Sequence, residues 1–453
     1  MISSPRPRPI TARLASALVA ASTIAVLPVT DIAASSPDCA SAIEYDELDH
    51  MTLHQALGES TEIEPGYGAT QSDLEAAEVE RDQIERQWLP QPEISSQGDI
   101  GKRVSPGAER DQGVSARASI HSSLSLLLYD SGRHWQRRLR DLQIDEAQAT
   151  QEVFDVDFRT DVARAYVEAY TARSRREVLE RERAFLDELA DVVDRRVEAG
   201  VESDYQARVL EESRARARRL AGDAADEFEA AVIELSGYVD RCIAPDELAT
   251  DVGAIADIDA PESPPEVRQL RRRAASADAD ADATEAQGRF EFRAIGTGGL
   301  YFSPAYDNVP EPEYFSGVSG LWRPDLSGTR GLQADAQSQR AEALQQEADS
   351  LERQAQRRLD ALTRRAEQLD DRRAALERQR DHTQQRAAAA TARWEQGVEQ
   401  WTEVVDARER LEEVRLDEID LYAEEAQVII EWTQLTGETE RLSGWLNNDD
   451  GDS

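Results

Sequence analysis

The 453-residue sequence is poor in several residue types, and each scarcity excludes a class of protein. Two cysteines and five histidines are too few for a disulfide-dense scaffold or a multi-cysteine zinc module. Lysine occurs once, at Lys102, and 52 Lys and Arg residues stand against 91 Asp and Glu residues. The net charge of −39 argues against binding to nucleic acid or to anionic lipid. Aromatic residues make up only 6%, which leaves little for one large globular core.

Motifs of catalysis and of metal binding are also missing. The sequence has no HExxH pair, no GxSxG and no phosphate-binding loop. Acidic pairs are frequent, but on an acidic chain rich in predicted helix they are typical of solvated faces. We therefore expect no enzymatic activity, no cofactor and no metal site.

The N-terminal residues 1–36 have the pattern of a secretory signal peptide. Three arginines precede an apolar segment, residues 14–29, and small residues follow at 33–36. The apolar segment has about 16 residues, which is short for the ~20 that a membrane-spanning helix needs, although a single anchor is the alternative. No later segment is apolar for long enough to be such a helix. An exported chain that enters a membrane must then do so through β-strands.

The two cysteines allow more than one interpretation. Ser36, Pro37 and Asp38 precede Cys39 and fit poorly with a lipoprotein signal, which has small apolar residues there. An exported protein lies in an oxidising compartment, so Cys39 and Cys242 are a possible disulfide. Two free thiols remain the alternative, because sequence does not reveal geometry.

The chain contains an internal duplication of nearly 200 residues. Three glycines recur at almost one offset: Gly132 with Gly328, Gly200 with Gly397, and Gly237 with Gly437. The flanking residues recur too, since an Arg lies four residues before Gly200 and also before Gly397. This period is far longer than the 20–50 residues of solenoid repeats.

Each unit has the same predicted order of elements. A modest helix (69–89 or 265–287) leads into a Gly- and Ser-rich stretch (90–130 or 289–327), and a long helical run follows (132–199 or 329–396). A glycine break and a second helix complete the unit. The predicted organisation is a signal peptide at 1–36, a first repeat at 37–240 with a β-hairpin at 93–128 and long helices at 132–237, a linker at 241–264, a second repeat at 265–440 with a β-hairpin at 289–323 and long helices at 329–437, and a short acidic tail at 441–453.

The long runs carry a seven-residue spacing of apolar residues, which specifies coiled-coil packing. The spacing is evident in two series: Leu179, Leu186 and Val193, and Leu362, Leu369 and Leu376. A helix of about 70 residues is roughly 100 Å long. Periodicity alone would favour a simple coiled-coil rod.

The stretches between the helices argue against a simple rod. From Val114 to Leu128 the even positions are mostly apolar and the odd positions mostly polar, which predicts a long strand with one apolar face. Such a strand suits a transmembrane barrel. Each unit offers two strands, four in all, and four strands cannot close a barrel without an exposed edge. The chain must then oligomerise, and a trimer would supply twelve strands.

Short motifs in this order resemble the TolC-like outer-membrane efflux protein family over about residues 50–440. They are Thr52-Leu53 with Ala56-Leu57, Leu89-Pro90 with Pro92, the segment from Leu128 to Arg133, and Asp161-Val162-Ala163 with Ala165-Tyr166. The arginine- and glycine-containing breaks and the ends at Gly237 and Gly437 complete the pattern.

The resemblance implies a mainly α fold with a membrane β-barrel portion: long antiparallel coiled-coil helices plus four transmembrane strands per protomer. The homotrimer would form a 12-stranded barrel in the outer membrane of a Gram-negative bacterium, with an α-helical tunnel in the periplasm. The tunnel would dock a periplasmic adaptor (membrane fusion) protein and an inner-membrane transporter. The chain would then be a passive exit duct, driven by that transporter, for efflux or for type I secretion.

The resemblance also implies two candidate sites. Exposed tips at the two glycine breaks would contact the adaptor through Arg196, Gly200, Val201, Arg393, Gly397 and Val398, although a plain turn explains the same residues. In this family acidic residues after the second tip form a ring at the periplasmic entrance. The matching positions here are Glu403 and Asp406, three residues apart on one helical face. In so acidic a chain, two carboxylates at these positions can also arise by chance.

Two other classes of protein remain open from the residues. A periplasmic adaptor is also exported and coiled-coil, but it would need a single helical hairpin split by a β-domain. A structural coiled-coil protein would have no channel. The duplicated hairpins argue against the adaptor, and the alternating strands argue against the rod.

Overall fold

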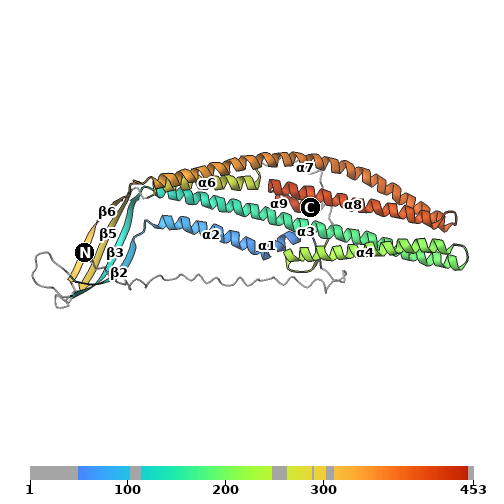
Figure 1. Ribbon diagram of the computed structural model, residues 1–453, viewed down its shortest axis with the longest axis horizontal. Coiled ribbons are helices and arrows are strands. Elements are labelled where there is room, and N and C mark those ends of the chain that lie inside the picture. Colours follow the sequence, from blue (N-terminus) through green and yellow to red (C-terminus); the bar gives the residue numbers. More distant parts are fainter. Residues whose placement is uncertain (1–48, 103–113, 247–262, 288–289, 303–310, 447–453) are drawn as a thin grey trace, which may run out of the picture.

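The computed structural model describes residues 49–102, 114–246, 263–287, 290–302 and 311–446. The predicted signal peptide at 1–36, Cys39 and most of the predicted linker at 241–264 lie outside these residues. The described part is elongated, with four strands at one end and two helical hairpin tips at the other (Figure 1). The long helices therefore run the distance between the sheet and the tips.

The helices and strands follow one another in this order: β1 (Asp49–Met51), α1 (Leu53–Ile63), α2 (Pro65–Arg86), β2 (Gln91–Lys102), β3 (Val114–Asp130), α3 (Arg133–Glu198), α4 (Asp204–Val239), β4 (Ile243–Pro245), α6 (Pro265–Ala286), β5 (Phe290–Phe302), β6 (Glu311–Trp322), α7 (Thr329–Glu395), α8 (Trp401–Thr436) and α9 (Thr439–Leu446). None of the helices in the described part of the chain has the length and apolar composition of a membrane span.

The two long helices, α3 and α7, bury their apolar residues at the predicted seven-residue spacing. In α7 one stripe has a buried residue at every seventh position, first as alanines and then as leucines: Ala334, Ala341, Ala348, Ala355, Leu362, Leu369 and Leu376. The alanine part is suited to close packing against α6, which is also rich in buried alanine, and the leucine part suits α8. The heptad prediction is thus confirmed in α7, and Leu179, Leu186 and Val193 confirm it in α3.

The end of α8 abuts the start of α6 along α7 (Figure 1). Gly437 ends α8 in the left-handed conformation, with φ of 79° and its amide bonded to the Thr433 carbonyl at 2.7 Å. A Cβ on this glycine would lie 2.7 Å from Cγ of Pro265, the first residue of α6. The junction accordingly needs glycine both for its backbone angle and for the close approach of proline.

A short parallel pair of strands, β1 and β4, crosses the middle of α3 and was not expected from the sequence. Tyr166 of α3 is fully buried there, donating a hydrogen bond to the Met51 carbonyl and accepting one from the Asp246 amide at 2.8 Å. The first residues of the predicted linker are therefore part of the folded core. Cys242, just before β4, takes part in a disulfide bond. Its pairing with Cys39 stays a prediction.

Helix α9 corrects the predicted start of the C-terminal tail. We predicted the tail from residue 441, but residues 441–446 are helical and their apolar side chains are buried. The Trp445 ring packs edge-on against Trp432 of α8, with 5.0 Å between ring centroids. The sharp turn that Gly437 allows folds this last segment back onto α8. Residues 447–453 lie outside the described part of the chain.

The four long strands form one antiparallel sheet in the order β2-β3-β5-β6. The two repeats meet at its centre, where β3 pairs with β5. Residues directly opposite one another share a face, so Ser123 lies with Thr297 on a polar face, and Ile120 lies with Leu300 on an apolar one. The alternation predicted from Val114 is confirmed by this register. The exposed apolar residues of that face include Ile94, Ile120, Leu124, Leu300, Tyr314 and Val318.

The junction between α8 and α6 gives a first prediction. Gly437→Ala is expected to lower the free energy of unfolding by about 2–3 kcal/mol, because the left-handed angle and the contact with Pro265 both oppose a methyl group. Gly397→Ala is the matched control, because Gly397 also has a left-handed φ, of 72°, but a new Cβ there would have nothing within 4 Å. We therefore expect Gly397→Ala to lower the free energy of unfolding by only about 1 kcal/mol. Thermal unfolding of the purified variants, followed by circular dichroism, compares the two. Equal losses would contradict a packing role for this junction.

Candidate functional site

The two hairpin tips have the same backbone geometry. Gly200 and Gly397 have φ of 71° and 72°, in the left-handed region that glycine adopts at no steric cost. Each tip is closed by the same pair of backbone hydrogen bonds. The glycine amide donates to the carbonyl three residues before it, and the following valine amide donates to the carbonyl five residues before it. All four hydrogen bonds are 2.9 Å long. The prediction that both breaks are helix–turn–helix tips is confirmed, and the turns are ones that only glycine makes without strain.

Near the tips the arginines have interaction partners within the chain, whereas the valines are exposed to solvent. The Arg196 guanidinium lies over the Trp394 ring, 4.8 Å from its centroid, and so links the first tip to the second. Arg393 forms an ion pair with Glu399 at 2.8 Å. Val201 and Val398 are 71% and 75% exposed. Within each predicted contact set, the valines are therefore the apolar groups most open to a partner.

A small core beneath the tips holds the two hairpins together. Trp401, the first residue of α8, is 1% exposed and packs in one cluster with Val193 of α3 and Leu210 of α4. Trp394 lies against the same cluster and also touches a neighbouring one on α7 and α8. The two tryptophans are seven residues apart in the sequence, on either side of Gly397. We did not use this spacing to predict the core beneath the tips.

The predicted ring residues, Glu403 and Asp406, lie on the exposed side of the first turns of α8. Val404 and Val405 are buried on the opposite side, which fixes the direction in which the two carboxylates face. The structure thus places both acids on one exposed face, and nothing in the single chain tests whether they form a ring.

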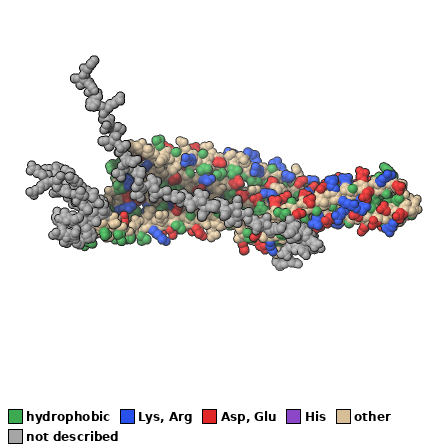
Figure 2. All heavy atoms as spheres, turned by 60° about the horizontal axis from the view of Figure 1, so that its bottom comes forward, with side chains coloured by type: hydrophobic (Ala, Val, Ile, Leu, Met, Phe, Trp, Pro, Cys, Tyr) green, Lys and Arg blue, Asp and Glu red, His purple; other side chains and the backbone are tan. Residues whose placement is uncertain are grey.

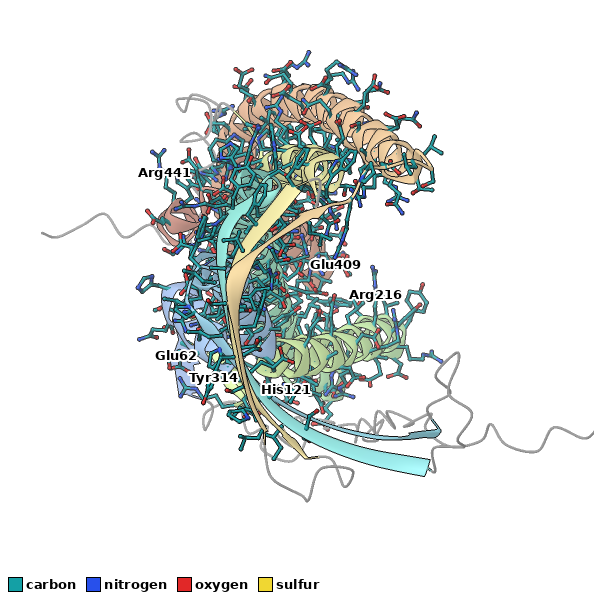
Figure 3. All side chains as sticks on the ribbon, turned by 90° about the vertical axis from the view of Figure 1, so that its left-hand side faces the viewer. Glu62, His121, Arg216, Tyr314, Glu409 and Arg441 are labelled. Atoms are coloured by element: carbon teal, nitrogen blue, oxygen red, sulfur yellow. The ribbon has the colours of Figure 1, made fainter. Side chains whose placement is uncertain are left out.

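An acidic cavity of about 600 Å³ continues from Asp406 between α3, α4 and α8. Two basic residues, Arg216 and Arg410, line it with six acidic ones: Glu182, Asp406, Glu409, Glu412, Glu413 and Asp417. Viewed along the molecule, the helices form an arc, and Glu409 and Arg216 lie on its inner side (Figure 3). The cavity that these two residues line therefore faces the concave side of the helical layer.

Glu182 is the most buried carboxylate of this cavity, with 8% of its side chain exposed. Its Oε1 accepts no hydrogen bond from the described residues, and its Oε2 lies 3.7 Å from Arg408 Nε, beyond hydrogen-bond range. Burial raises the pKa of the Glu182 carboxyl. Burial, together with the negative charges of Glu182 and Glu409, also raises the pKa of Glu412 to about 7.

The raised pKa of Glu412 predicts a stability that depends on pH. In the unfolded chain this carboxyl has its ordinary pKa of 4.5, so between about pH 4.5 and 7 the folded protein holds a proton that the unfolded chain has released. Stability is then greater at low pH and falls as pH rises through that window. Glu412→Gln is expected to raise the free energy of unfolding above pH 7 by about 1 kcal/mol, a modest amount because solvent screens a half-buried group.

Denaturant unfolding at a series of pH values measures this effect. The stabilities of the variant and the wild type should converge well below pH 4.5, where Glu412 is protonated in both the folded and the unfolded wild type. Glu188→Gln on the exposed side of α3 is the charge-matched control and should change stability little at any pH. If the difference in stability between Glu412→Gln and the wild type did not change with pH, the raised pKa of Glu412 would not be its cause.

Comparison with known proteins identifies the fold. No family model matches the sequence, and no curated protein matches it. Among solved structures, the outer-membrane channel OprN matches with a TM-score of 0.68 and 18% identity, over 85% of this chain and 89% of that one. The Campylobacter jejuni outer membrane channel CmeC matches with a TM-score of 0.70 and 10% identity, over 88% and 87%.

The outer membrane protein VceC from Vibrio cholerae is a further neighbour, with a TM-score of 0.66 and 14% identity, over 85% of this chain and 96% of that one. These alignments extend over most of this chain and of the neighbours' chains. The identities are too low to carry residue roles across. The chain has the fold of the TolC-like outer-membrane channels.

Proposed function

We propose that this chain is the outer-membrane exit duct of an efflux system, with type I secretion as the other transport role open to it. The observation that carries the proposal is the amphipathic four-stranded sheet, whose apolar face is exposed in the single chain. Val318 is 69% and Tyr314 is 83% exposed on that face. Lipid is the solvent that makes such a face favourable. The described neighbours OprN and CmeC, named as outer-membrane channels, support the same role.

The sheet also supports a homotrimer. Within the described residues, the outermost strands β2 and β6 each pair on one side only, which leaves two open edges. In the lipid interior every backbone group needs a partner, so the edges must be closed by other copies. Three copies supply twelve strands and close the barrel, and three of the helical arcs in Figure 3 enclose a tunnel. The two repeats, 37–240 and 265–440, would each supply one hairpin of the barrel.

In this arrangement the strands lie in the outer membrane of a Gram-negative bacterium and the helices extend into the periplasm. The helical half carries charged side chains over the surface visible in Figure 2, as a segment surrounded by water requires. An exported chain fits the predicted signal peptide at 1–36. A periplasmic adaptor or a structural coiled-coil protein, the alternatives from the sequence, would leave the apolar face of the sheet without a purpose.

The tips would then form the periplasmic end, where an adaptor docks. Val201 and Val398 offer exposed apolar contacts, and the turns at Gly200 and Gly397 set their direction. Arg196 and Arg393 would act mainly by fixing the tips, because both guanidinium groups have partners within the chain. The inner-membrane transporter beyond the adaptor would supply the energy, and this chain would be a conduit with no catalytic role.

Glu403 and Asp406 would form the acidic ring of the entrance. Threefold symmetry repeats both exposed carboxylates around one axis, and such a ring attracts cations and repels anions. In the first repeat the matching positions are Gln206 and Val209, so only the second tip supplies acids.

The apolar face of the sheet gives a direct prediction. Val318→Asp is expected to reduce insertion into lipid vesicles, because a charged side chain on the lipid-facing side of a barrel strand is unfavourable near mid-membrane. Ser319→Asp is the matched control, since the neighbouring residue lies on the opposite face and should insert normally. Flotation of the refolded variants with vesicles measures insertion. Similar insertion of both variants would contradict a membrane-facing sheet.

Conductance of the purified trimer in planar bilayers tests the channel and the ring together. The wild type is expected to form a cation-selective pore. Glu403→Gln with Asp406→Asn should lower the cation-to-anion permeability ratio at least about twofold, because it removes charges at the constriction. Glu198→Gln with Glu202→Gln makes the same charge change at the first tip and should leave selectivity close to that of the wild type.

The outcomes separate the two claims. A pore whose selectivity is unchanged in the first double variant would retain the channel and discard the ring. An inserted trimer that conducts no ions would contradict the channel.

A further inference from the structure

A different cavity, of about 630 Å³, lies between α3, α7 and α8 and contrasts in charge with the acidic one. We propose that it binds an organic carboxylate with an apolar body, whose carboxylate group is held by Arg181 and Arg415. The cavity is formed within one chain, so the inference goes beyond the proposed function and stands whether or not three copies form a channel. A volume of this size is typical of sites for small organic ligands.

The cavity is rich in hydrogen-bond donors that have no acceptor. Tyr170, Ser174 and Arg181 lie on one face of α3, at intervals of four and seven residues, and Arg415 lines the same cavity from α8. Among the described residues, the two hydroxyl groups and Arg415 have no hydrogen-bond partner, and the Arg181 guanidinium donates only through Nε, to the Glu177 carbonyl at 3.0 Å. None of these unpartnered donor atoms is buried, so a ligand can reach them.

The two arginines lie close together without a carboxylate between them. Burial and the positive charges of Arg181 and Arg408 lower the pKa of the Arg415 guanidinium, although Glu418 and Glu182 partly offset these charges. Among the described residues, neither Arg181 nor Arg415 has a carboxylate oxygen within ion-pair distance. In a chain with 91 acidic and 52 basic residues, two neighbouring arginines without an acid are an exception. An anion bound between the two guanidinium groups would relieve their repulsion.

The carboxylates that line the cavity do not supply this anion. Glu177, Glu418 and Glu425 pair with other arginines, the first two at 2.9 Å and 3.1 Å and the third through two hydrogen bonds. The remaining carboxylate, that of Glu377, is exposed to solvent. The positive charges left without a partner inside the cavity are therefore those of Arg181 and Arg415.

The other end of the cavity is aromatic. The rings of Tyr170 and Tyr422 contact each other, with 5.1 Å between their centroids. Arg415 and Tyr422 are seven residues apart on α8, and seven residues of helix span roughly 10 Å. Val178 of α3 and Ile419 of α8 line the stretch between the two ends. A ligand with a body of about that length would place its carboxylate at the arginines and its apolar end at the tyrosine rings.

The cavity opens on the side of α8 that faces away from the acidic cavity. Glu418 lines it and follows Glu409 by nine residues, about two and a half turns of helix, so the two side chains point in opposite directions. Glu409 lies on the inner side of the helical arc (Figure 3). In the proposed channel the cavity would therefore open on the outer surface of the tunnel, and a ligand would reach it from the periplasm.

Isothermal titration of the purified full-length protein with 4-phenylbutanoate tests the proposal. Acetate has the carboxylate without the apolar body, and 4-phenylbutylamine has the same body with a positive charge. We expect phenylbutanoate to bind at least about tenfold more tightly than either, because only phenylbutanoate uses both ends of the cavity. The net charge of −39 attracts the amine, so a preference for the anion would not arise from diffuse attraction.

Substitutions of arginine locate the binding. Arg415→Gln should weaken phenylbutanoate binding about tenfold, because it removes charge-assisted hydrogen bonds to the ligand. Arg183→Gln, the same change at an exposed arginine of α3 outside the cavity, is the matched control and should weaken binding less than about twofold. Arg181→Gln is a second variant at an exposed residue of the cavity and should also weaken binding.

The contrary results are equally definite. Equal weakening by Arg415→Gln and Arg183→Gln would contradict the site. Binding of the amine as tight as that of phenylbutanoate would mean that the phenyl group enters an apolar environment without recognition of the carboxylate. Absence of phenylbutanoate binding to the wild type would overturn the site outright. If Arg415→Gln fails to fold, Arg181→Gln decides the question. None of these results bears on the pore, which is measured separately.

Discussion

The constraint on which the structure depends is that two very long helices must cover their apolar stripes along their full length. Helices α3 and α7 have 66 and 67 residues, whereas α4 and α8 have 36 each and α2 and α6 have 22 each. Two shorter helices placed end to end therefore accompany each long one. The joints between them become the critical points: Gly437 against Pro265 in the second repeat, and the strands β1 and β4 in the first. In a chain with so few aromatic residues, stability comes from this lengthwise packing.

Charged side chains also link the helices that pack along one another. Many arginines pair with acids on neighbouring helices, as Arg175 of α3 does with Asp420 of α8 at 2.5 Å and with Glu227 of α4 at 3.1 Å. Each exposed pair contributes little alone, but pairs that span different helices favour one register over others. Acids exceed bases so strongly that many remain outside such pairs. Glu403 and Asp406 of α8, with the acidic cavity beside them, are examples of such acids.

The long elements could be predicted from the sequence because their signals repeat. Seven-residue spacing, period-two alternation and paired glycines each recur in both halves, and α3, β3 and the two tips formed as expected. The elements that were missed have no such period: β1 and β4 have three residues each, and α9 follows a glycine in a polar segment. The cavity did leave a signal. Glu182 stands between Leu179 and Leu186 in the apolar stripe of α3, where a charged residue conflicts with the pattern.

Acidic residues within an apolar stripe need not share one role, and the structure separates two of them. Glu425 of α8 is 2% exposed and is held by Arg373 of α7 through two parallel hydrogen bonds, one of them 2.9 Å long. Its charge is satisfied within the fold, which makes it part of the contact between those helices. Glu182 is buried to a similar degree, but its ion pair with Arg408 is longer, at 3.7 Å, and that guanidinium also lies over the Phe185 ring. The position of one guanidinium therefore decides whether a buried carboxylate is held by two short hydrogen bonds or only by a longer ion pair.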